Sequence, residues 1–251
     1  YLDTIAFTAR EDGGSPEFLP DYDEDGLLNW IIFSSDQVIV PALSTGEVEI
    51  SIVIPGSVES GGHYAAVTVS DAPEDVIATN GAIVEAKTAV LVLLTVEGET
   101  NLSAALLDFV DVSSSKFRST FDSEFVYRIQ NQGNVHVMPE GFVRFRDIFG
   151  RTLWAVGAND TEGRVLPGST RSYEVEVDTY IEGWMETISQ QMRRLAIGPI
   201  FVDLEISYAE DEEVLEETLT FIYIPWQLIS SVLLLILLLK FVYRSGTKNR
   251  S

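Results

Sequence analysis

Cysteine is absent from this chain of 251 residues, and histidine occurs only twice, at His63 and His136. Without cysteine there is no disulfide framework and no thiolate nucleophile or metal ligand. Neither histidine lies in a catalytic or zinc-binding motif, so we expect each imidazole to be satisfied by local turn backbone. Acidic residues are abundant, yet no two are singled out as a carboxylate pair for glycoside hydrolysis. The sequence therefore predicts a protein that is not an enzyme.

Basic residues are scarce and unevenly distributed. The chain has 16 Lys and Arg against 39 Asp and Glu, and four of the basic residues lie beyond Trp226, where there is no acid. The preceding part thus has 12 basic and 39 acidic side chains, an excess of 27 negative charges. Such a surface repels nucleic acid and anionic lipid head groups, and it attracts cations or basic partners. Nucleic-acid binding is excluded on this ground, and solubility of an exposed domain is the simpler explanation of the charge.

Only one long apolar run is present. Residues 222–243 read IYIPWQLISSVLLLILLLKFVY. About 20 apolar residues are what a helix needs to cross the hydrocarbon core of a bilayer. Trp226 and Tyr243 are placed as interfacial aromatics, and Lys240 is close enough to the end to snorkel outward. We therefore expect a single-pass transmembrane helix, with a buried core helix as the alternative.

The residues around this run predict the orientation of the chain. The tail, 244–251, is purely basic, which places the C-terminus in the cytoplasm and the N-terminus outside under the positive-inside rule. This topology requires a signal peptide, so we expect one to have been removed ahead of Tyr1. Eukaryotic cell-surface chains of this size usually keep disulfides. The lack of cysteine therefore indicates the plasma membrane of a bacterial envelope.

Hydrophobic periodicity predicts an all-β fold. Residues 1–30 are rich in acids, Gly and Pro and read as a loop-rich segment, which we interpret as a trimmed part of the first domain. Beyond them, short stretches of period-two alternation are separated by turn sequences, a pattern typical of antiparallel sandwiches. The expected strands are 37–40, 47–54, 63–70, 84–96, 106–112, 124–130, 142–147, 152–157, 170–177, 200–208 and 214–224.

A polar break at 97–101 divides these strands into two groups. We therefore expect two tandem immunoglobulin-like β-sandwich domains, at 31–100 and 101–221, each long enough to bury its own core. The transmembrane helix at 222–243 and the basic cytoplasmic tail at 244–251 follow.

One segment of the second domain has helical rather than strand periodicity. In 180–196, YIEGWMETISQQMRRLA, the apolar residues fall on one narrow stripe. This amphipathic helix is expected near the membrane, with its stripe dipping into the lipid interface. The alternative is a lid packed on the open end of the sandwich. The interfacial residues predicted here are Trp184, Met185, Ile188 and Met192, alongside Trp226 and Tyr243 of the anchor.

An acidic loop near the N-terminus has the spacing of a calcium site. Asp21, Asp23 and Asp25 alternate in DYDEDG, which matches the first half of a calcium-binding loop. The twelfth position is Ile32, where a bidentate Glu is expected, so other acids would have to complete the site. The two interpretations are a calcium ion as the only cofactor and a solvated acidic loop with no cofactor.

Several strings together resemble the WxL-interacting surface proteins of bacteria. They are LLNWIIFSSDQVIVPA at 27–42, VIPGSVESGGHYAAVTVSD at 53–71, LLDF at 106–109, RIQNQGNVHVMPEGFVRFRDIFG at 128–150, VLPGSTRSYEVEVD at 165–178 and IPWQLI at 224–229. The resemblance implies two immunoglobulin-like domains and a membrane anchor. It also implies that the first domain binds peptidoglycan and the second binds a host or partner protein. The chain departs from that pattern because only 26 loop-like residues precede Leu27.

Taken together, these features predict a membrane-anchored, extracytoplasmic binding or scaffold protein of a bacterial envelope. Its expected partners are membrane lipid, through the C-terminal helix, and either peptidoglycan or another envelope protein. The alternative is a non-catalytic subunit of a larger membrane or surface-layer assembly. Exposed aromatics near the 61–64 turn are candidate contacts, and the sequence identifies no individual ligand-binding residue.

Overall fold

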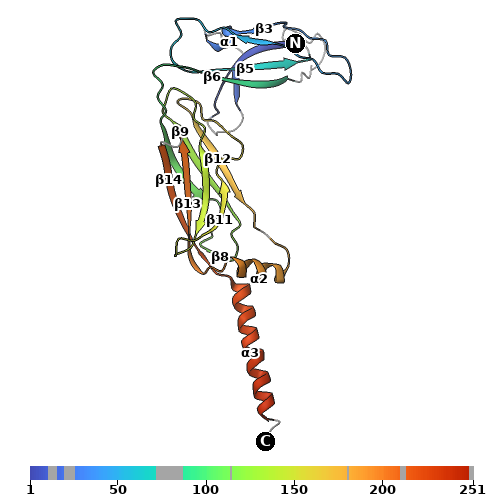
Figure 1. The fold of residues 1–251 in the computed structure, drawn as a ribbon, viewed down its shortest axis with the longest axis vertical. Coiled ribbons are helices and arrows are strands. Elements are labelled where there is room, and N and C mark those ends of the chain that lie inside the picture. The colour runs from blue at the N-terminus through green and yellow to red at the C-terminus, as the bar shows by residue number, and fades with distance from the viewer. Residues whose placement is uncertain are drawn as a thin grey trace, which may run out of the picture. The chain divides into compact units, whose positions relative to one another are not determined.

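The computed structural model describes residues 1–10, 16–19, 26–71, 87–113, 115–179, 181–209 and 213–248. Strands are the commonest regular structure among these residues, as the hydrophobic pattern predicts, and a long apolar helix follows the last strand (Figure 1). The structure divides into two compact units, described separately below. Unit 1 comprises Tyr1–Ala105, Ile129–Met138 and Arg164–Ser172, and unit 2 comprises Leu106–Arg128, Pro139–Gly163 and Tyr173–Ser251.

Unit 1 is built on a four-stranded antiparallel sheet of order β2-β1-β5-β6. Its strands are β1 (Leu2–Thr8), β2 (Glu17–Leu19), β5 (Gly61–Ser70) and β6 (Lys87–Val96). The expectation that residues 1–30 form a loop-rich segment is therefore wrong for β1, which pairs with β2 on one side and β5 on the other. The tertiary setting decides this, because an extended apolar segment satisfies its backbone polar groups by pairing.

A helical turn and a short hairpin pack against this sheet. They are α1 (Leu27–Trp30) and the pair β3 (Ile31–Phe33) and β4 (Ile50–Ile52). Trp30 is buried with Leu27 against Ala65 and Val67 of β5, at the end of the helical turn α1. Unit 1 thus shows one sheet and a hairpin, and the finer expectation of an immunoglobulin-like sandwich stays a prediction.

The remaining strands form a five-stranded sheet of order β11-β10-β13-β14-β8 and a three-stranded sheet of order β12-β9-β7. The strands predicted between 106 and 224 are all present within a few residues of their expected bounds. The structure adds the short strand β8, which no sequence pattern predicted. The bounds are β7 (Ala104–Asp111), β8 (Phe117–Arg118), β9 (Ser123–Asn131), β10 (Glu140–Arg146), β11 (Thr152–Gly157), β12 (Thr170–Val177), β13 (Gly198–Tyr208) and β14 (Glu213–Tyr223).

Aromatic side chains form the core of unit 2. Every second residue of β13 is buried, which is the alternation that a strand with one covered face requires. Phe145 of β10 meets Phe125 of β9 and Phe121 edge-on, with ring centroids 5.8 Å apart in both pairs. Phe121 also stacks on Tyr223 at 4.6 Å, and Tyr223 is the last residue of β14. This packing fixes the strand end from which the C-terminal helix departs.

Two helices complete unit 2, and both differ in length from the sequence prediction. The amphipathic helix α2 spans Trp184–Arg193 rather than 180–196, because Gly183 has φ 111° and Arg194 leaves the helical region. The apolar helix α3 spans Trp226–Lys248 rather than 222–243. Residues 222 and 223 belong to β14, and Pro225, which cannot donate a strand hydrogen bond, separates the strand from the helix.

Candidate functional site

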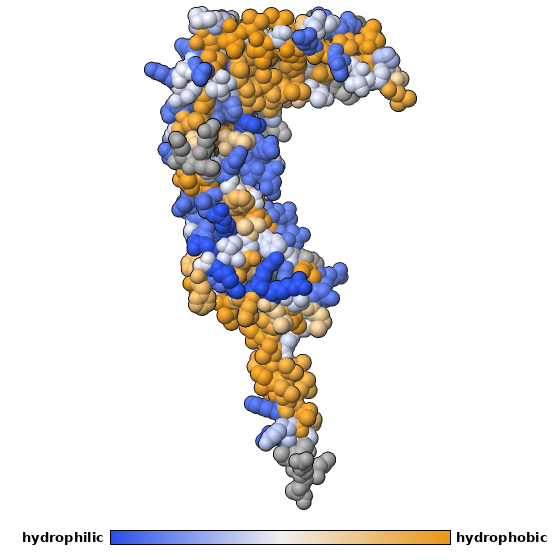
Figure 2. All heavy atoms as spheres, viewed as in Figure 1, coloured by the Kyte–Doolittle hydropathy of each residue, from blue (hydrophilic) through white to orange (hydrophobic). Residues whose placement is uncertain are grey.

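The apolar helix α3 is exposed along its length. Trp226–Ser245 is long and apolar enough to cross a membrane, and none of it is buried. Leu233, Leu235 and Leu237 are each more than half exposed, and Figure 2 shows the helix as apolar along the face in view. A helix that is apolar all round is normally buried in protein or lipid, since its transfer from water is favourable. The helix therefore requires an apolar environment that the described residues do not provide.

The predicted interfacial residues of α2 are largely accessible. Trp184, Met185 and Met192 are exposed by 49, 72 and 62%, while Ile188 is half-buried. Trp226 and Tyr243 of α3 are exposed by 50 and 75%. The lid alternative requires this apolar stripe to be packed on the sandwich. Instead Gln191 is the buried residue of α2, and three of the four stripe residues are exposed.

A polar junction joins α2 to the first turn of α3. Gln191 donates through Nε2 to Gln227 Oε1 at 2.7 Å, and its Oε1 accepts from the backbone N–H of Leu228 at 3.0 Å. The Leu228 N–H lies in the first turn of α3, where backbone donors have no partner within the helix. Trp184 and Trp226 pack edge-on with ring centroids 5.3 Å apart. The sequence missed Gln191, since it resembles any solvent-facing glutamine.

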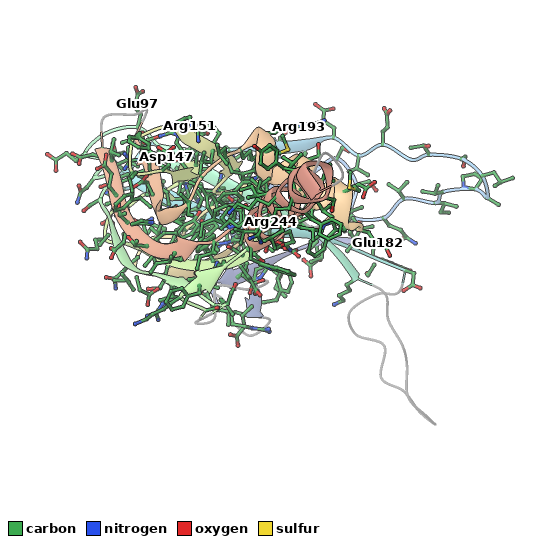
Figure 3. The ribbon with its side chains drawn as sticks, turned by 90° about the horizontal axis from the view of Figure 1, so that it is seen from below. Glu97, Asp147, Arg151, Glu182, Arg193 and Arg244 are labelled. Atoms are coloured by element: carbon green, nitrogen blue, oxygen red, sulfur yellow. The ribbon has the colours of Figure 1, made fainter. Side chains whose placement is uncertain are left out.

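The exposed side chain of Phe149 lies at the end of the five-stranded sheet from which α3 departs. Gly198 pairs with Tyr223 and Arg146 pairs with Phe201, so the turn after β10 is at the end where α3 begins. Asp147 shapes this turn by accepting from the N–H groups of Phe149 and Arg151, and Figure 3 shows Asp147 and Arg151 side by side. Phe149 is 87% exposed at its tip.

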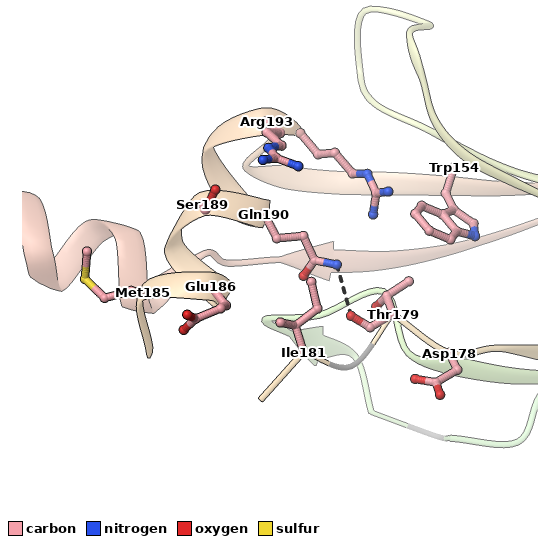
Figure 4. A pocket seen from close by; sticks show the side chains of 10 residues that line it. Trp154, Asp178, Thr179, Ile181, Met185, Glu186, Ser189, Gln190 and Arg193 are labelled. Atoms are coloured by element: carbon pink, nitrogen blue, oxygen red, sulfur yellow. Dashed lines mark hydrogen bonds between the residues drawn. The ribbon is translucent and has the colours of Figure 1, made fainter. Parts of the chain in front are cut away.

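A pocket of about 570 Å³ lies beside α2 (Figure 4). Gln190 closes one side by donating to the carbonyl of Thr179 at 3.0 Å. Arg194 covers the indole of Trp154, with its guanidinium carbon 3.7 Å from the ring centroid. Sequence reasoning missed this pocket because its two principal residues are 40 positions apart and belong to no motif.

The predicted calcium site is not part of this region. Asp21, Asp23 and Asp25 lie outside the described residues. Among the described residues, no group of three or more His, Asp or Glu side chains could hold a metal ion. Calcium therefore stays a prediction.

Both histidines have partners in unit 1, but the expectation of local turn backbone is confirmed for His63 alone and is wrong for His136. His63 Nε2 lies 3.0 Å from the carbonyl of Glu59, as expected of a turn residue, and its ring packs against Trp30. His136 instead approaches the hydroxyl of Tyr64 through Nδ1, at 3.5 Å. Burial raises the pKa of Tyr64 to about 12. Burial also lowers the pKa of His136, and the positive charge of Arg164 lowers it further.

Comparison with known proteins gives little further guidance. The sequence matches no family model and no curated protein. Two similar solved structures are the class 5 fimbriae chaperone CfaA, at 14% identity, and a chain of a chaperone–tip adhesin complex of CFA/I fimbriae, at 12%. Each match covers 89% of this chain and 84% of the other chain, with a TM-score of 0.36. This likeness carries no argument about function, and no comparison supports the resemblance to WxL-interacting proteins.

Proposed function

We propose that this chain is a membrane-anchored, non-catalytic binding protein of a bacterial envelope. In this proposal α3 crosses the plasma membrane with its basic end in the cytoplasm. The β-strand units lie on the outer side, where they hold cell-wall material or another envelope protein. The apolar stripe of α2 and the turn carrying Phe149 rest in the lipid interface, where amphipathic segments bind.

The observation that carries this proposal is the exposure of α3. Its leucines have no covering protein among the described residues. Lipid would satisfy this surface, while Trp226 and Tyr243 occupy positions that suit the two interfaces. The junction at Gln191 supports an interfacial position for α2, because it fixes this short helix against the first turn of the apolar one.

Extraction of the full chain from bacterial membranes tests the anchor. We expect the chain to resist alkaline carbonate and to dissolve only in detergent. Leu235→Arg combined with Leu237→Arg should move it to the soluble fraction, since each arginine costs about 3 kcal/mol at the centre of a membrane helix. Leu235→Ala with Leu237→Ala is the matched control and should stay in the membrane. Carbonate release of the unaltered chain would refute the anchor.

Binding to the cell wall is tested separately by co-sedimentation of the detergent-solubilised full chain with purified sacculi, with and without calcium. Pelleting that depends on calcium would support wall binding and the acidic loop together. Pelleting that does not depend on calcium would support binding to the cell wall without a calcium site. If the chain stays in the supernatant, binding to the cell wall is refuted, and the partner in the proposal is another envelope protein.

A second candidate function is a subunit of a larger assembly, and one observation favours it. The segment between β3 and β4, residues 34–49, forms a long loop with side chains on both sides (Figure 3), here named the arm. Ile39 is 87% exposed at this arm, and Leu43 is fully exposed with φ 62°. A leucine in the left-handed region is strained, and exposure gives it no packing in return. Contact with another protein would account for both features.

A further inference from the structure

The pocket beside α2 contains donors that no described residue satisfies. Nη1 of Arg194 and Nε1 of Trp154 are both buried, and neither has a hydrogen-bond partner within the described part of the chain. A buried donor without a partner costs about 1–3 kcal/mol, and more when it carries charge. Both donors belong to side chains that line this one pocket and stack on each other, which points to a ligand that supplies the missing acceptors.

The charge of the pocket points to an anionic group. Arg193 and Arg194 both line it, and neither forms an ion pair with a described acid. Burial lowers the pKa of Arg194, although Tyr223 opposes the shift. The guanidinium remains charged, because its ordinary pKa is above 12. Favourable charge at the C-terminal end of a helix explains the position of Arg193. The same effect does not explain why the Arg194 guanidinium stacks on the Trp154 indole, or why Nη1 of Arg194 is buried without a partner among the described residues.

The pocket also contains negative charge, which narrows the class of ligand. The carboxylates of Glu186 and Asp178 line the same space, and Asp178 has a partner of its own. A dianion would be repelled by these groups and by the excess of acids on the chain. A phosphodiester carries one negative charge, and a linked ammonium could lie toward Glu186. Arginine and indole N–H groups are suitable donors to phosphate oxygens.

The position of the pocket decides between sources of such a group. Gln190 and Arg194 line it, and Gln191, which lies between them, contacts the first turn of α3. The pocket is therefore within about one helix diameter, roughly 10 Å, of the start of the apolar helix. With Trp226 at the membrane surface, as in the proposed function on which this inference rests, the pocket lies at the depth of the lipid head groups.

We propose that the pocket formed by Trp154, Arg193 and Arg194 binds the phosphodiester of a zwitterionic lipid head group of the phosphoethanolamine type. Arg194 and the Trp154 indole N–H hold the phosphate oxygens, and Arg193 closes the exposed side. Glu186 accepts the ammonium. The pocket thereby couples the position of α2 to the lipid that surrounds the anchor.

Native mass spectrometry of the full chain in detergent tests this site with added phosphatidylethanolamine. We expect one retained lipid per chain, and binding weaker by about tenfold or more in Arg194→Gln. Trp154→Phe removes only the indole donor and keeps the ring under Arg194, so its weaker binding cannot be attributed to lost folding. Arg128→Gln is the matched control. It removes an exposed arginine that is ion-paired with Asp108, and it should bind as the unaltered chain does.

The source of the phosphodiester is tested by competition. Glycerophosphoethanolamine, which lacks acyl chains, and inorganic phosphate should displace the lipid only weakly. If glycerophosphoethanolamine binds as tightly as the lipid, the ligand is a soluble phosphodiester and the lipid assignment is overturned. Equal lipid retention in all variants would overturn the site itself. Because binding is measured in detergent, that outcome is distinguishable from failure of the anchor, which carbonate extraction reports.

Discussion

At the residue scale, one buried amide connects two elements of unit 2. Gln191 is 2% exposed, and it supplies both a donor and an acceptor to α3 while a further contact reaches the carbonyl of Ser119. A buried polar side chain is stable only when its hydrogen bonds are made. The residue therefore holds the amphipathic helix against the first turn of α3.

Gln191→Met should release α2 from α3. Methionine keeps the length of the side chain but leaves the Leu228 N–H and Gln227 Oε1 without their partner, which we expect to cost about 1–3 kcal/mol. Faster tryptic cleavage at Arg193 and Arg194 in the detergent-solubilised chain would report the release. Gln190→Met is the control, because its bond is to Thr179 and not to α3. Identical cleavage of both variants would contradict the junction.

His136 should make the stability of unit 1 depend on pH. Burial lowers its pKa in the folded state, so the unfolded chain binds the proton more readily. The contribution of neutral His136 to the free energy of unfolding is fully present above its pKa in the unfolded chain, about 6.5. This contribution is lost as the pH falls through the pKa of His136 in the folded state. We expect the free energy of unfolding to decline on acidification below pH 6.5, and less so in His136→Gln. Tyr64→Phe removes the phenol but not the imidazole, so it should keep the decline.

At the element scale, the arm and α3 expose apolar side chains for different reasons. Two hydrogen bonds join the ends of the arm. The Ser34 N–H donates to the carbonyl of Glu49, and the Ser34 hydroxyl oxygen accepts from the Glu49 N–H. Its tip is a turn in which the Ser44 N–H donates to Pro41. None of these interactions requires Ile39 or Leu43 to be apolar. In α3, by contrast, the apolar character extends over the whole span, as a membrane helix requires.

Replacing Ile39 and Leu43 by serine should leave stability almost unchanged. Both side chains are exposed, so we expect a change within about 0.5 kcal/mol in the free energy of unfolding. Val67→Ala, which removes buried volume from the core of unit 1, is the comparison and should destabilise clearly. If the arm contacts a partner, cross-linking of the full chain in membranes should lose its adducts in the serine variant alone. A large loss of stability would show instead that the arm belongs to the core.

At the scale of the whole molecule, charge is divided at the start of α3. All 39 acids precede Trp226, and only basic charges follow it. Under the positive-inside rule the basic residues of the tail predict that it lies in the cytoplasm, as in the proposed function. The excess of acids also explains why the proposed lipid site favours a zwitterionic over an anionic head group.

The absence of cysteine makes this orientation directly measurable. Glu217→Cys places a single thiol on an exposed position of β14, and Lys248→Cys places one at the end of α3. A membrane-impermeant maleimide should label the first variant on intact bacterial spheroplasts and the second only after permeabilisation. Labelling in the reverse order would invert the topology, and labelling of both on intact spheroplasts would exclude a spanning helix.

Local patterns predicted most strands of this protein and predicted their partners poorly. The strand expected at 37–40 is wrong, because these residues lie in the loop between β3 and β4. The alternation of β13 and β14 and the apolar run of α3 are readable because each depends on residues adjacent in the chain. The strand β1 was missed, since LDTIAFT lies in an acidic, Gly-rich neighbourhood and is extended only because β2 and β5 pair with it. The boundary of α3 was displaced for a similar reason, as Tyr223 is held by the aromatic core.

The sequence by itself determined the β-rich composition, the apolar helix, the amphipathic stripe of α2 and the separation of charge, because each is a property of neighbouring residues. Only the tertiary structure decided which face of α2 is buried, that Gln191 joins it to α3, and that Arg194 covers Trp154. These contacts join residues 36 to 40 positions apart. No local pattern specifies them, since they depend on which strand ends the fold brings together and on the energetic cost of leaving buried polar groups unpaired.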